Sequence, residues 1–314
     1  MTSLKTVTAL VFFSLLVVLP IFLSSYYVGL MVLMLIFSIF AMSLNILLGY
    51  CGLPSLGHAS FFGVAAYTTG FLALKGVQNF WLGATAGVIL SLIVATIFGF
   101  LVQRTRGVYF MMITLALSQV LWGIAFKWTS VTHGDDGLSG ILRPNLVFIQ
   151  LDLSNTTVYY YFVLFFFVVA TGAVLLVAQS PFGLTLKGIR DSETRMRTLG
   201  YNIWVYQYVA FILAGFFASI AGIFSVYYHG YVGPSDLNIV TSAKVLLMVI
   251  LGGAGTLVGP IVGAFGIVLL ENFISCYTER WLLLLGLIYV LVIIFAPQGI
   301  YPPIKKRIYK WLTL

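Results

Sequence analysis

Apolar and polar residues occupy long separate blocks along this chain. An apolar run of about 20 residues is long enough to cross a bilayer as a helix. The pattern predicts an all-α integral membrane protein with about ten transmembrane helices in one permease-like domain, residues 1–314. The runs extend from about Val7 to Leu23, Val28 to Leu48, Ala59 to Leu74, Trp81 to Val102, Val108 to Trp128, Val158 to Ala178, Val205 to Tyr228, Val240 to Leu251, Leu257 to Ile274 and Arg280 to Ala296.

The first run has a second interpretation, as a secretory signal peptide. No A-x-A-like cleavage site follows it, and the next run begins within a few residues. We therefore favour a retained first span.

Two glycine-rich stretches interrupt the apolar pattern at membrane depth. Non-helical backbone is tolerated there only against protein or a water-filled cavity, so both stretches predict broken helices. Paired broken helices are typical of a translocation path. Residues 48–63 and 251–266 share five of sixteen positions, which we interpret as two hinges and not as a duplicated unit. The predicted hinge residues are Gly49, Gly52, Gly57, Gly252, Gly253, Gly255, Gly259 and Pro260.

One long polar segment, Gln179 to Trp204, lies between apolar runs. Ser180 suits a helix N-cap and Pro181 the first helical position, while Gly200 can end the helix. Gly183 and Gly188 leave open a division into two short helices. The segment is too charged to cross a membrane. We predict a cytosolic helix that receives force from another protein.

Composition supports a membrane location. Apolar residues make up 61% of the chain and charged residues 8%, whereas about a quarter of the residues in a soluble domain are charged. The net charge of +8 does not indicate nucleic acid binding, because the basic residues lie between the apolar runs.

Those basic residues predict the topology. With the N-terminus inside and ten spans, eleven of the 16 Lys and Arg residues fall on the cytosolic side, as the positive-inside rule requires. Both termini are then cytosolic, 129–157 is a periplasmic loop and 179–204 is a cytosolic loop.

No catalytic or metal-binding pattern is present. The three histidines have neither metal-ligand nor catalytic spacing, and the chain has no Walker A sequence. We interpret Asp135 and Asp136 as part of a glycine-rich outer turn, with a weaker alternative as a contact surface for a soluble carrier. Lys244 is expected to extend to the outer interface, and Glu271 to reach water. No acidic group is clearly placed at mid-membrane to couple an ion, so the membrane body lacks an energy source of its own.

Several motifs together resemble the branched-chain amino acid permeases of bacterial ABC importers, in particular their LivM branch. The resemblance covers roughly residues 40 to 300. Its motifs are Leu44-Asn45, Leu48-Gly49-Tyr50, Ser55-Leu56-Gly57-His58-Ala59, Phe62-Gly63, Ala66-Tyr67-Thr68, Ser180-Pro181-Phe182-Gly183, Gly188-Ile189-Arg190-Asp191, Leu199-Gly200-Tyr201-Asn202, Gly252-Gly253-Ala254-Gly255-Thr256, Gly259-Pro260, Gly263-Ala264 and Ala296-Pro297-Gln298-Gly299.

The resemblance implies a type II ABC importer-like, multi-pass permease in the bacterial inner membrane. It implies a second related permease, two cytosolic ATPase subunits that bind ATP, and a periplasmic solute-binding protein as partners. The chain itself would carry no cofactor and catalyse no reaction. The resemblance also suggests that the segment from Asn45 to Tyr67 lies along the pathway, with Asn45, Ser55, His58 and Tyr67 as candidates, and Gln119 is a further candidate. From the residues alone, we expect His58 to hydrogen-bond across neighbouring helices, and Asn45 and Gln119 to join helices. The implied ATPase-coupling residues are Pro181, Gly183, Lys187, Arg190, Asp191, Arg195, Arg197 and Gly200.

Departures from the family pattern affect the solute more than the fold. Pro54 replaces an expected branched residue, and Thr132-His133-Gly134-Asp135 replaces a Thr-Gly-Gly-Ser-type run. Branched-chain amino acids are the expected solutes. The alternatives are urea or amide transport, which the pattern separates poorly, and an ion-coupled secondary transporter. An intramembrane enzyme would need a reactive pair, which is not found.

Overall fold

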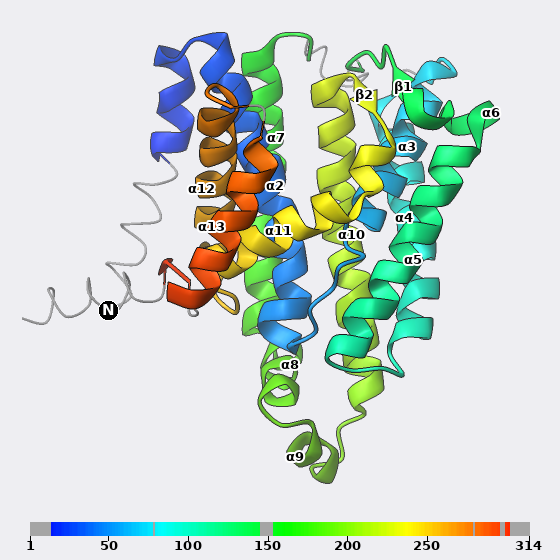
Figure 1. Cartoon of the computed structure of the whole chain (residues 1–314), viewed down its shortest axis with the longest axis vertical. Coiled ribbons are helices and arrows are strands. Elements are labelled where there is room, and N and C mark those ends of the chain that lie inside the picture. Colours follow the sequence, from blue (N-terminus) through cyan, green and yellow to red (C-terminus); the bar gives the residue numbers. More distant parts are fainter. Residues whose placement is uncertain (1–13, 78, 145–152, 279, 296–298, 302–314) are drawn as a thin grey trace, which may run out of the picture.

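The computed structural model describes residues 14–77, 79–144, 153–278, 280–295 and 299–301. Helices dominate this part of the chain (Figure 1). Residues 14–22 are also helical. The longer elements are α2 (Ser25–Asn45), α3 (Ala59–Leu74), α4 (Phe80–Val102), α5 (Val108–Lys127), α7 (Thr156–Gln179), α10 (Ile203–His229), α11 (Ile239–Gly252), α12 (Val258–Ser275) and α13 (Trp281–Phe295).

The shorter elements lie at the ends of this bundle and at its breaks. They are the π-helix η1 (Ile46–Cys51), α6 (Thr129–Thr132), η2 (Gly134–Asp136), α8 (Pro181–Asp191), α9 (Glu193–Thr198) and η3 (Pro234–Leu237). The strands β1 (Leu138–Ser139) and β2 (Tyr231–Val232) pair antiparallel. For the described residues, the expectation of an all-α chain is correct apart from these two short strands of two residues each.

Helix α2 forms the centre of the bundle. It packs against α7, α10, α11 and α12, while α10 also packs against α3 and α4. Helix α2 is buried by these neighbours along most of its length, from Val28 to Asn45. In its most apolar window 89% of the residues are buried, against 22% for α5. The exposed faces of α4, α5, α7 and α12 are therefore available to lipid or to other subunits.

Among the described residues, six helices are long and apolar enough to cross a membrane: α2 with η1, α4, α5, α7, α10 and α12. Two further predicted spans, α3 and α11, have only 16 and 14 residues. Parts of the first and last predicted spans lie outside the described residues, as do both termini. The count of ten spans therefore stays a prediction.

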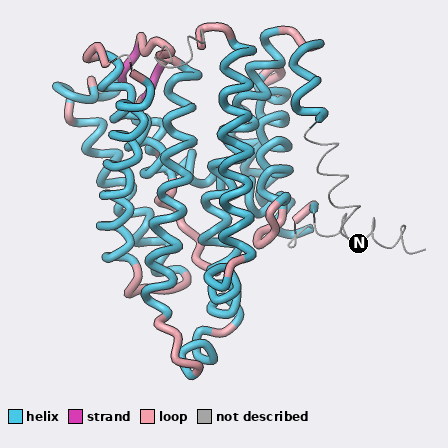
Figure 2. The backbone as a smooth tube through the Cα atoms, turned by 180° about the vertical axis from the view of Figure 1, so that it is seen from behind, coloured by secondary structure: helices cyan, strands magenta, loops and turns pink. Residues whose placement is uncertain are grey.

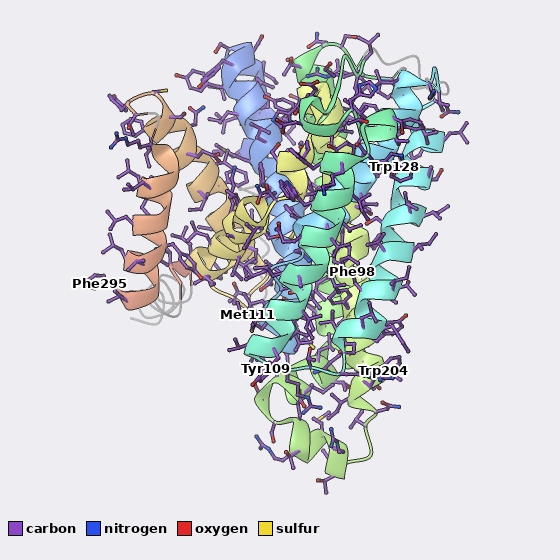
Figure 3. The ribbon with its side chains drawn as sticks, turned by 45° about the vertical axis from the view of Figure 1, so that its right-hand side comes forward. Phe98, Tyr109, Met111, Trp128, Trp204 and Phe295 are labelled. Atoms are coloured by element: carbon purple, nitrogen blue, oxygen red, sulfur yellow. The ribbon has the colours of Figure 1, made fainter. Side chains whose placement is uncertain are left out.

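The two ends of the bundle differ in charge. Helices α8 and α9 project from one end beside Arg104 and Arg106, and the two strands lie at the opposite end (Figure 2). Asp135 and Asp136 of η2 lie at the strand end. We call the α8–α9 end the inner end and the strand end the outer end, because the positive-inside rule assigns them so. Figure 3 shows Tyr109 and Trp204 towards the inner end and Trp128 towards the outer end, as in an aromatic belt.

The first glycine-rich break is shorter than the sequence predicts. Gly49 lies within the π-helical extension of α2, and the helix ends only at Gly52, which has φ +76°. Non-helical backbone then leads from Gly52 to α3. The second break is where the sequence predicts it, between α11 and α12.

Candidate functional site: the inner junction

The polar segment 179–204 contacts both glycine-rich breaks at one place, which we call the inner junction (Asn45, Gly49, Arg190, Gly255 and Thr256). Nη1 of Arg190 on α8 donates a 2.6 Å hydrogen bond to the carbonyl oxygen of Gly49 in η1. The same Nη1 atom is 2.9 Å from where a Cβ at Gly255 would lie. A side chain at Gly255 would therefore collide with the guanidinium.

Asn45 holds the second break against the first. Its Nδ2 donates to the carbonyl of Thr256 at 2.9 Å, and its Oδ1 accepts from the N–H of Gly255 at 2.9 Å. Asn45 is fully buried, where an unpaired amide would be costly. One side chain on the central helix thus satisfies two backbone groups of the turn between α11 and α12, the N–H of Gly255 and the carbonyl of Thr256.

Helix α8 begins as the sequence predicts. The N–H of Gly183 donates to Oγ of Ser180 at 3.3 Å, and Pro181 occupies the first turn. A Cβ on Gly183 would overlap the carbonyl oxygen of Val177 at the end of α7. Glycine at this position therefore permits the tight turn from α7 into α8. Lys187 lies over the Tyr50 ring at 5.2 Å, a second contact between α8 and η1.

The rest of the predicted coupling set lies on the exposed side of this segment. Asp191 forms a 3.2 Å ion pair with Arg190. Ser192 separates α8 from α9 in extended backbone. The single helix predicted between Ser180 and Gly200 is therefore two short helices, the alternative left open, and the division is at Ser192 and not at Gly183 or Gly188. Arg195 and Arg197 are exposed on α9. Gly200 has φ +85° just past the end of α9, a backbone conformation that favours glycine.

Glu193 is a contact that the sequence did not single out. Its carboxylate forms an ion pair with Arg106 of the α4–α5 loop. It also accepts a 3.2 Å hydrogen bond from Nε2 of Gln207 on α10. Asp191 and Glu193 are the only two acids of residues 179–204. That scarcity is the sequence signal that could have identified Glu193 as an ion-pair partner for a neighbouring cation.

The glycines of the second break permit close backbone packing. A Cβ on Gly252 would overlap the carbonyl of Gly259, and a Cβ on Gly263 would overlap that of Met248. A Cβ on Gly259 would meet the carbonyl of Gly253. Helices α11 and α12 therefore form a tightly packed hairpin, with Pro260 buried in the first turn of α12. Their predicted role as hinges stays a prediction.

The segment between η1 and α3 is fixed to two neighbouring helices. The N–H of Leu56 donates to Oγ1 of Thr114 on α5 at 3.2 Å. The N–H of Ala59 donates to Oγ of Ser242 on α11 at 3.0 Å. A Cβ on Gly57 would overlap the backbone carbonyl of Thr114. This segment thus leads into α3 and is hydrogen-bonded to α5 and α11, and these three helices also contact one another.

Two of the predicted pathway residues lie inside this packing. Ser55 and His58 are fully buried. Nε2 of His58 is 2.7 Å from Oγ of Ser43, and its ring stacks on Phe40 at 5.5 Å between centroids. Nδ1 of His58 is buried without a hydrogen-bond partner. His58 therefore makes the cross-helix hydrogen bond expected from the sequence.

Two more predicted pathway residues, Tyr67 and Gln119, lie on α3 and α5. Within the part of the chain that the structure describes, the Tyr67 hydroxyl and Nε2 of Gln119 are buried without hydrogen-bond partners. Tyr67 interacts electrostatically with Asp236 of η3. Burial raises the pKa of the Asp236 carboxyl, against the opposing effects of the Gly233 N–H and of His229. Both helices contact η3, and the role of these residues in a solute pathway stays a prediction.

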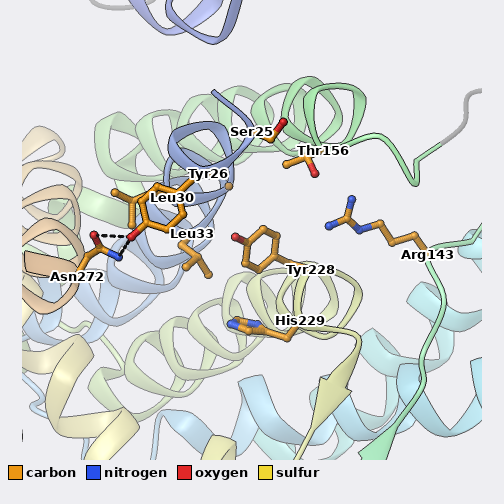
Figure 4. Close-up of a pocket in the computed structure, with 10 residues that line it drawn as sticks. Ser25, Tyr26, Leu30, Leu33, Arg143, Thr156, Tyr228, His229 and Asn272 are labelled. Carbon is orange, nitrogen blue, oxygen red and sulfur yellow. Dashed lines mark hydrogen bonds between the residues drawn. The ribbon is translucent and has the colours of Figure 1, made fainter. Parts of the chain in front are cut away.

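The structure has an outer and an inner hollow, and neither is lined by the predicted pathway residues. The outer hollow, of about 340 Å³, is lined by residues that include Tyr26, Arg143, Tyr228 and Asn272 (Figure 4). Arg143 there donates to the carbonyls of Tyr227, Leu153 and Ser154 at 3.1 to 3.2 Å. The inner hollow, of about 540 Å³, lies beside α9.

Lys244 and Glu271 correct a detail of the sequence interpretation. Lys244 forms an ion pair with Glu271, and its ammonium lies 4.3 Å from the centre of the Phe37 ring. Both side chains are largely buried, at 15% and 24% exposure. The pair joins α11 to α12. From the sequence, Lys244 is expected to extend to the outer interface and Glu271 to reach water, without contact between them.

The arrangement can transmit displacement but holds no group for bond chemistry at the junction. Among the described residues, no three His, Cys, Asp or Glu side chains gather as a metal site. At the junction, the guanidinium of Arg190 on the projecting helix α8 is hydrogen-bonded to the backbone of η1, where α2 ends.

Comparison with known proteins agrees with the sequence motifs. The family model described as "Branched-chain amino acid transport system / permease component" matches residues 26–296. LivM of Salmonella typhimurium, a high-affinity branched-chain amino acid transport system permease protein, is 27% identical; the match covers 87% of this chain and 69% of LivM. The corresponding LivH of Escherichia coli is 21% identical over 86% of this chain and 93% of its own length.

An archaeal protein from Methanocaldococcus jannaschii, named a probable branched-chain amino acid transport permease protein LivM, is 23% identical. That match covers 87% of this chain and 94% of the archaeal protein. No solved structure matches significantly.

Proposed function

Because the chain belongs to the family of permease components of branched-chain amino acid transport systems, we propose that it forms the solute pathway of an ATP-driven importer together with a second related permease. It is a multi-pass membrane component and not an enzyme. The proposed solutes are leucine, isoleucine, valine or related amino acids, by analogy with the named relatives. A periplasmic binding protein would deliver them to the outer end.

The observation that carries this proposal is the hydrogen bond from Arg190 to Gly49. Two cytosolic ATPase subunits would bind ATP and press on α8 and α9 at the inner end. Since Arg190 contacts η1 and lies against Gly255, a displacement of α8 would reach both broken helices at once. Residues 179–204 then act as the coupling loop of a single permease domain, 1–314, with 129–157 as its periplasmic loop.

The test is solute-stimulated ATP hydrolysis by the complex of this chain with the subunits encoded beside it. In proteoliposomes containing the binding protein, leucine, isoleucine or valine should stimulate hydrolysis and uptake, whereas urea and short amides should not. If only urea or an amide stimulates ATP hydrolysis, the proposal of a branched-chain amino acid as the solute is wrong. Uptake driven by a proton or sodium gradient without the ATPase subunits would reject the importer.

A deletion separates the coupling loop from the solute question. Removing residues 189–198 should abolish solute-stimulated hydrolysis while leaving membrane insertion intact. Full coupling in a properly inserted deletion variant would reject the role of α8 and α9.

A further inference from the structure

The inner hollow is bordered by three cations, of which two have no ion-pair partner among the described residues. Arg104, Arg106 and Arg197 line it. Within the described parts of the chain, only Arg106 has an ion-pair partner, Glu193. Arg104 lies 5.8 Å from the centre of the Phe100 ring, and Arg197 is exposed on α9. The one carboxylate beside the hollow among the described residues, that of Glu193, is held by Arg106 and Gln207, so the guanidinium groups of Arg104 and Arg197 are left to attract an anion.

A buried amide in the same hollow lacks a partner. Gln103 lines the hollow and is only 7% exposed. Among the described residues, neither its Oε1 nor its Nε2 has a hydrogen-bond partner. A buried polar group without a partner is costly. A water or ligand oxygen in the hollow would satisfy this amide, and its NH₂ group is a donor suited to a phosphate or glycerol oxygen.

The surroundings of the hollow favour a lipid. Trp204 lines it and stacks on Tyr208 at 4.8 Å between ring centroids. Trp204 also contacts Phe100 of α4 edge-on, with centroids 6.4 Å apart. Near this level α4 and α10 carry exposed apolar side chains on the outside of the bundle, namely Ile97, Phe100, Leu101, Val205 and Val209. A tryptophan at this height is typical of the headgroup region, as Figure 3 illustrates for Trp204.

We propose that the inner hollow binds the phosphate headgroup of an anionic phospholipid, whose acyl chains lie on the exposed apolar face of α4 and α10. Arg104 and Arg197 supply the charge, and Gln103 donates to a headgroup oxygen. Basic hollows between helices on the cytosolic side recognise anionic headgroups in this manner. The lipid would join the α4–α5 loop to α9 beside the Arg106–Glu193 ion pair, and so stabilise the position of the coupling segment.

The experiment measures thermal unfolding of the full-length chain in an uncharged detergent. Dioleoylphosphatidylglycerol should raise Tm by several degrees more than dioleoylphosphatidylcholine at equal concentration. Inorganic phosphate in a third arm should give no such rise, since it lacks acyl chains. Equal shifts from the two lipids would overturn the proposal. A full shift from inorganic phosphate would also overturn it, in favour of a soluble anion.

Variants identify the site. Arg104→Gln with Arg197→Gln should weaken phosphatidylglycerol binding by about tenfold or more. The matched control is Arg195→Gln with Lys127→Gln, which removes the same charge from exposed positions outside the hollow and should keep the shift. Loss of the shift in both variants would mean a non-specific charge effect and reject the site.

A third variant guards against simple misfolding. Gln103→Leu removes the unpartnered amide, so Tm without added lipid should stay equal or rise while the phosphatidylglycerol shift becomes smaller. A full shift in Gln103→Leu would remove that residue from the site. Stabilisation of the wild-type chain by purified ATPase subunits, with no preference for phosphatidylglycerol, would assign the hollow to those subunits and overturn the lipid proposal.

Discussion

Arg190 and Gly49 are 141 positions apart in the chain, yet the guanidinium of one donates to the carbonyl of the other at 2.6 Å. Gly49 lies in a π-helical turn, and such turns occur frequently at functional sites. The contact joins a helix outside the bundle to the helix at its centre.

Arg190→Gln tests the contact directly. Glutamine keeps a donor but not the charge or the reach, and a hydrogen bond to a charged group contributes about 1.5–3 kcal/mol. We expect solute uptake per ATP hydrolysed to fall about tenfold in proteoliposomes. Arg190→Lys, which keeps the charge without the planar fork, should be intermediate. Unchanged coupling in both variants, with normal assembly, would contradict the proposed path of force.

Asn45→Leu tests the link between the two breaks. Leucine is similar in size but leaves the N–H of Gly255 and the carbonyl of Thr256 without partners, at a cost of about 1–3 kcal/mol each. Tm should fall clearly. The control is Ser38→Ala on the same helix, whose hydroxyl bonds only within its own helix to Met34. An equal decrease for the two variants would show that Asn45 has no special role.

Gly263→Ala should prevent stable folding, because its Cβ would overlap the backbone carbonyl of Met248, which cannot move independently. Gly266→Ala is the matched control one turn along α12. There a Cβ would meet only the Leu251 side chain, at 3.5 Å. Yield after detergent extraction and size-exclusion profiles measure the difference. Normal yield of Gly263→Ala would mean that α11 and α12 pack less closely than described.

The Lys244–Glu271 pair predicts non-additive effects. Removing one partner leaves a buried charge unpaired, which costs about 3–5 kcal/mol, whereas replacing both is often neutral. We expect Lys244→Leu and Glu271→Leu to lower Tm strongly, and the double variant to recover most of the loss. A double variant at least as unstable as the sum of the single variants would exclude a direct interaction.

Cysteine labelling tests the assignment of the inner and outer ends. Arg195→Cys should react with an impermeant thiol reagent only from the cytosolic side, and Asp135→Cys only from outside. Cys276 is exposed and must first be replaced by serine, while Cys51 is buried. Labelling of Arg195→Cys from outside would reverse the topology and remove the ATPase contact.

The sequence predicted well whatever depends on local pattern. Its apolar runs agree with the helices within a few residues, and Ser180, Pro181 and Gly200 correctly indicated the start of α8 and the turn after α9. Long periodic segments with local caps report their own structure, because each signal depends on neighbours a few positions away.

The sequence could not predict contacts between distant segments. Nothing local distinguishes Asn45 as the partner of residues 255 and 256, or Lys244 as the partner of Glu271. The sequence predicts hinges at the glycines because glycine-rich stretches interrupt the apolar runs at membrane depth. The structure gives several of them another reason, since the carbonyls against which they pack leave no room for a Cβ. The π-helical turn was missed because it differs from an α-turn by one residue and has no composition of its own.

The short length of α11 has a consequence for the backbone that follows it. Its 14 residues rise about 1.5 Å each and span about 21 Å, whereas the hydrocarbon core is about 30 Å thick. The helix is therefore too short to cross that core alone, and the amides of the turn after it require water or protein around them. Asn45 bonds to Gly255 and Thr256 in that turn, so the carboxamide of the central helix takes the place of water there.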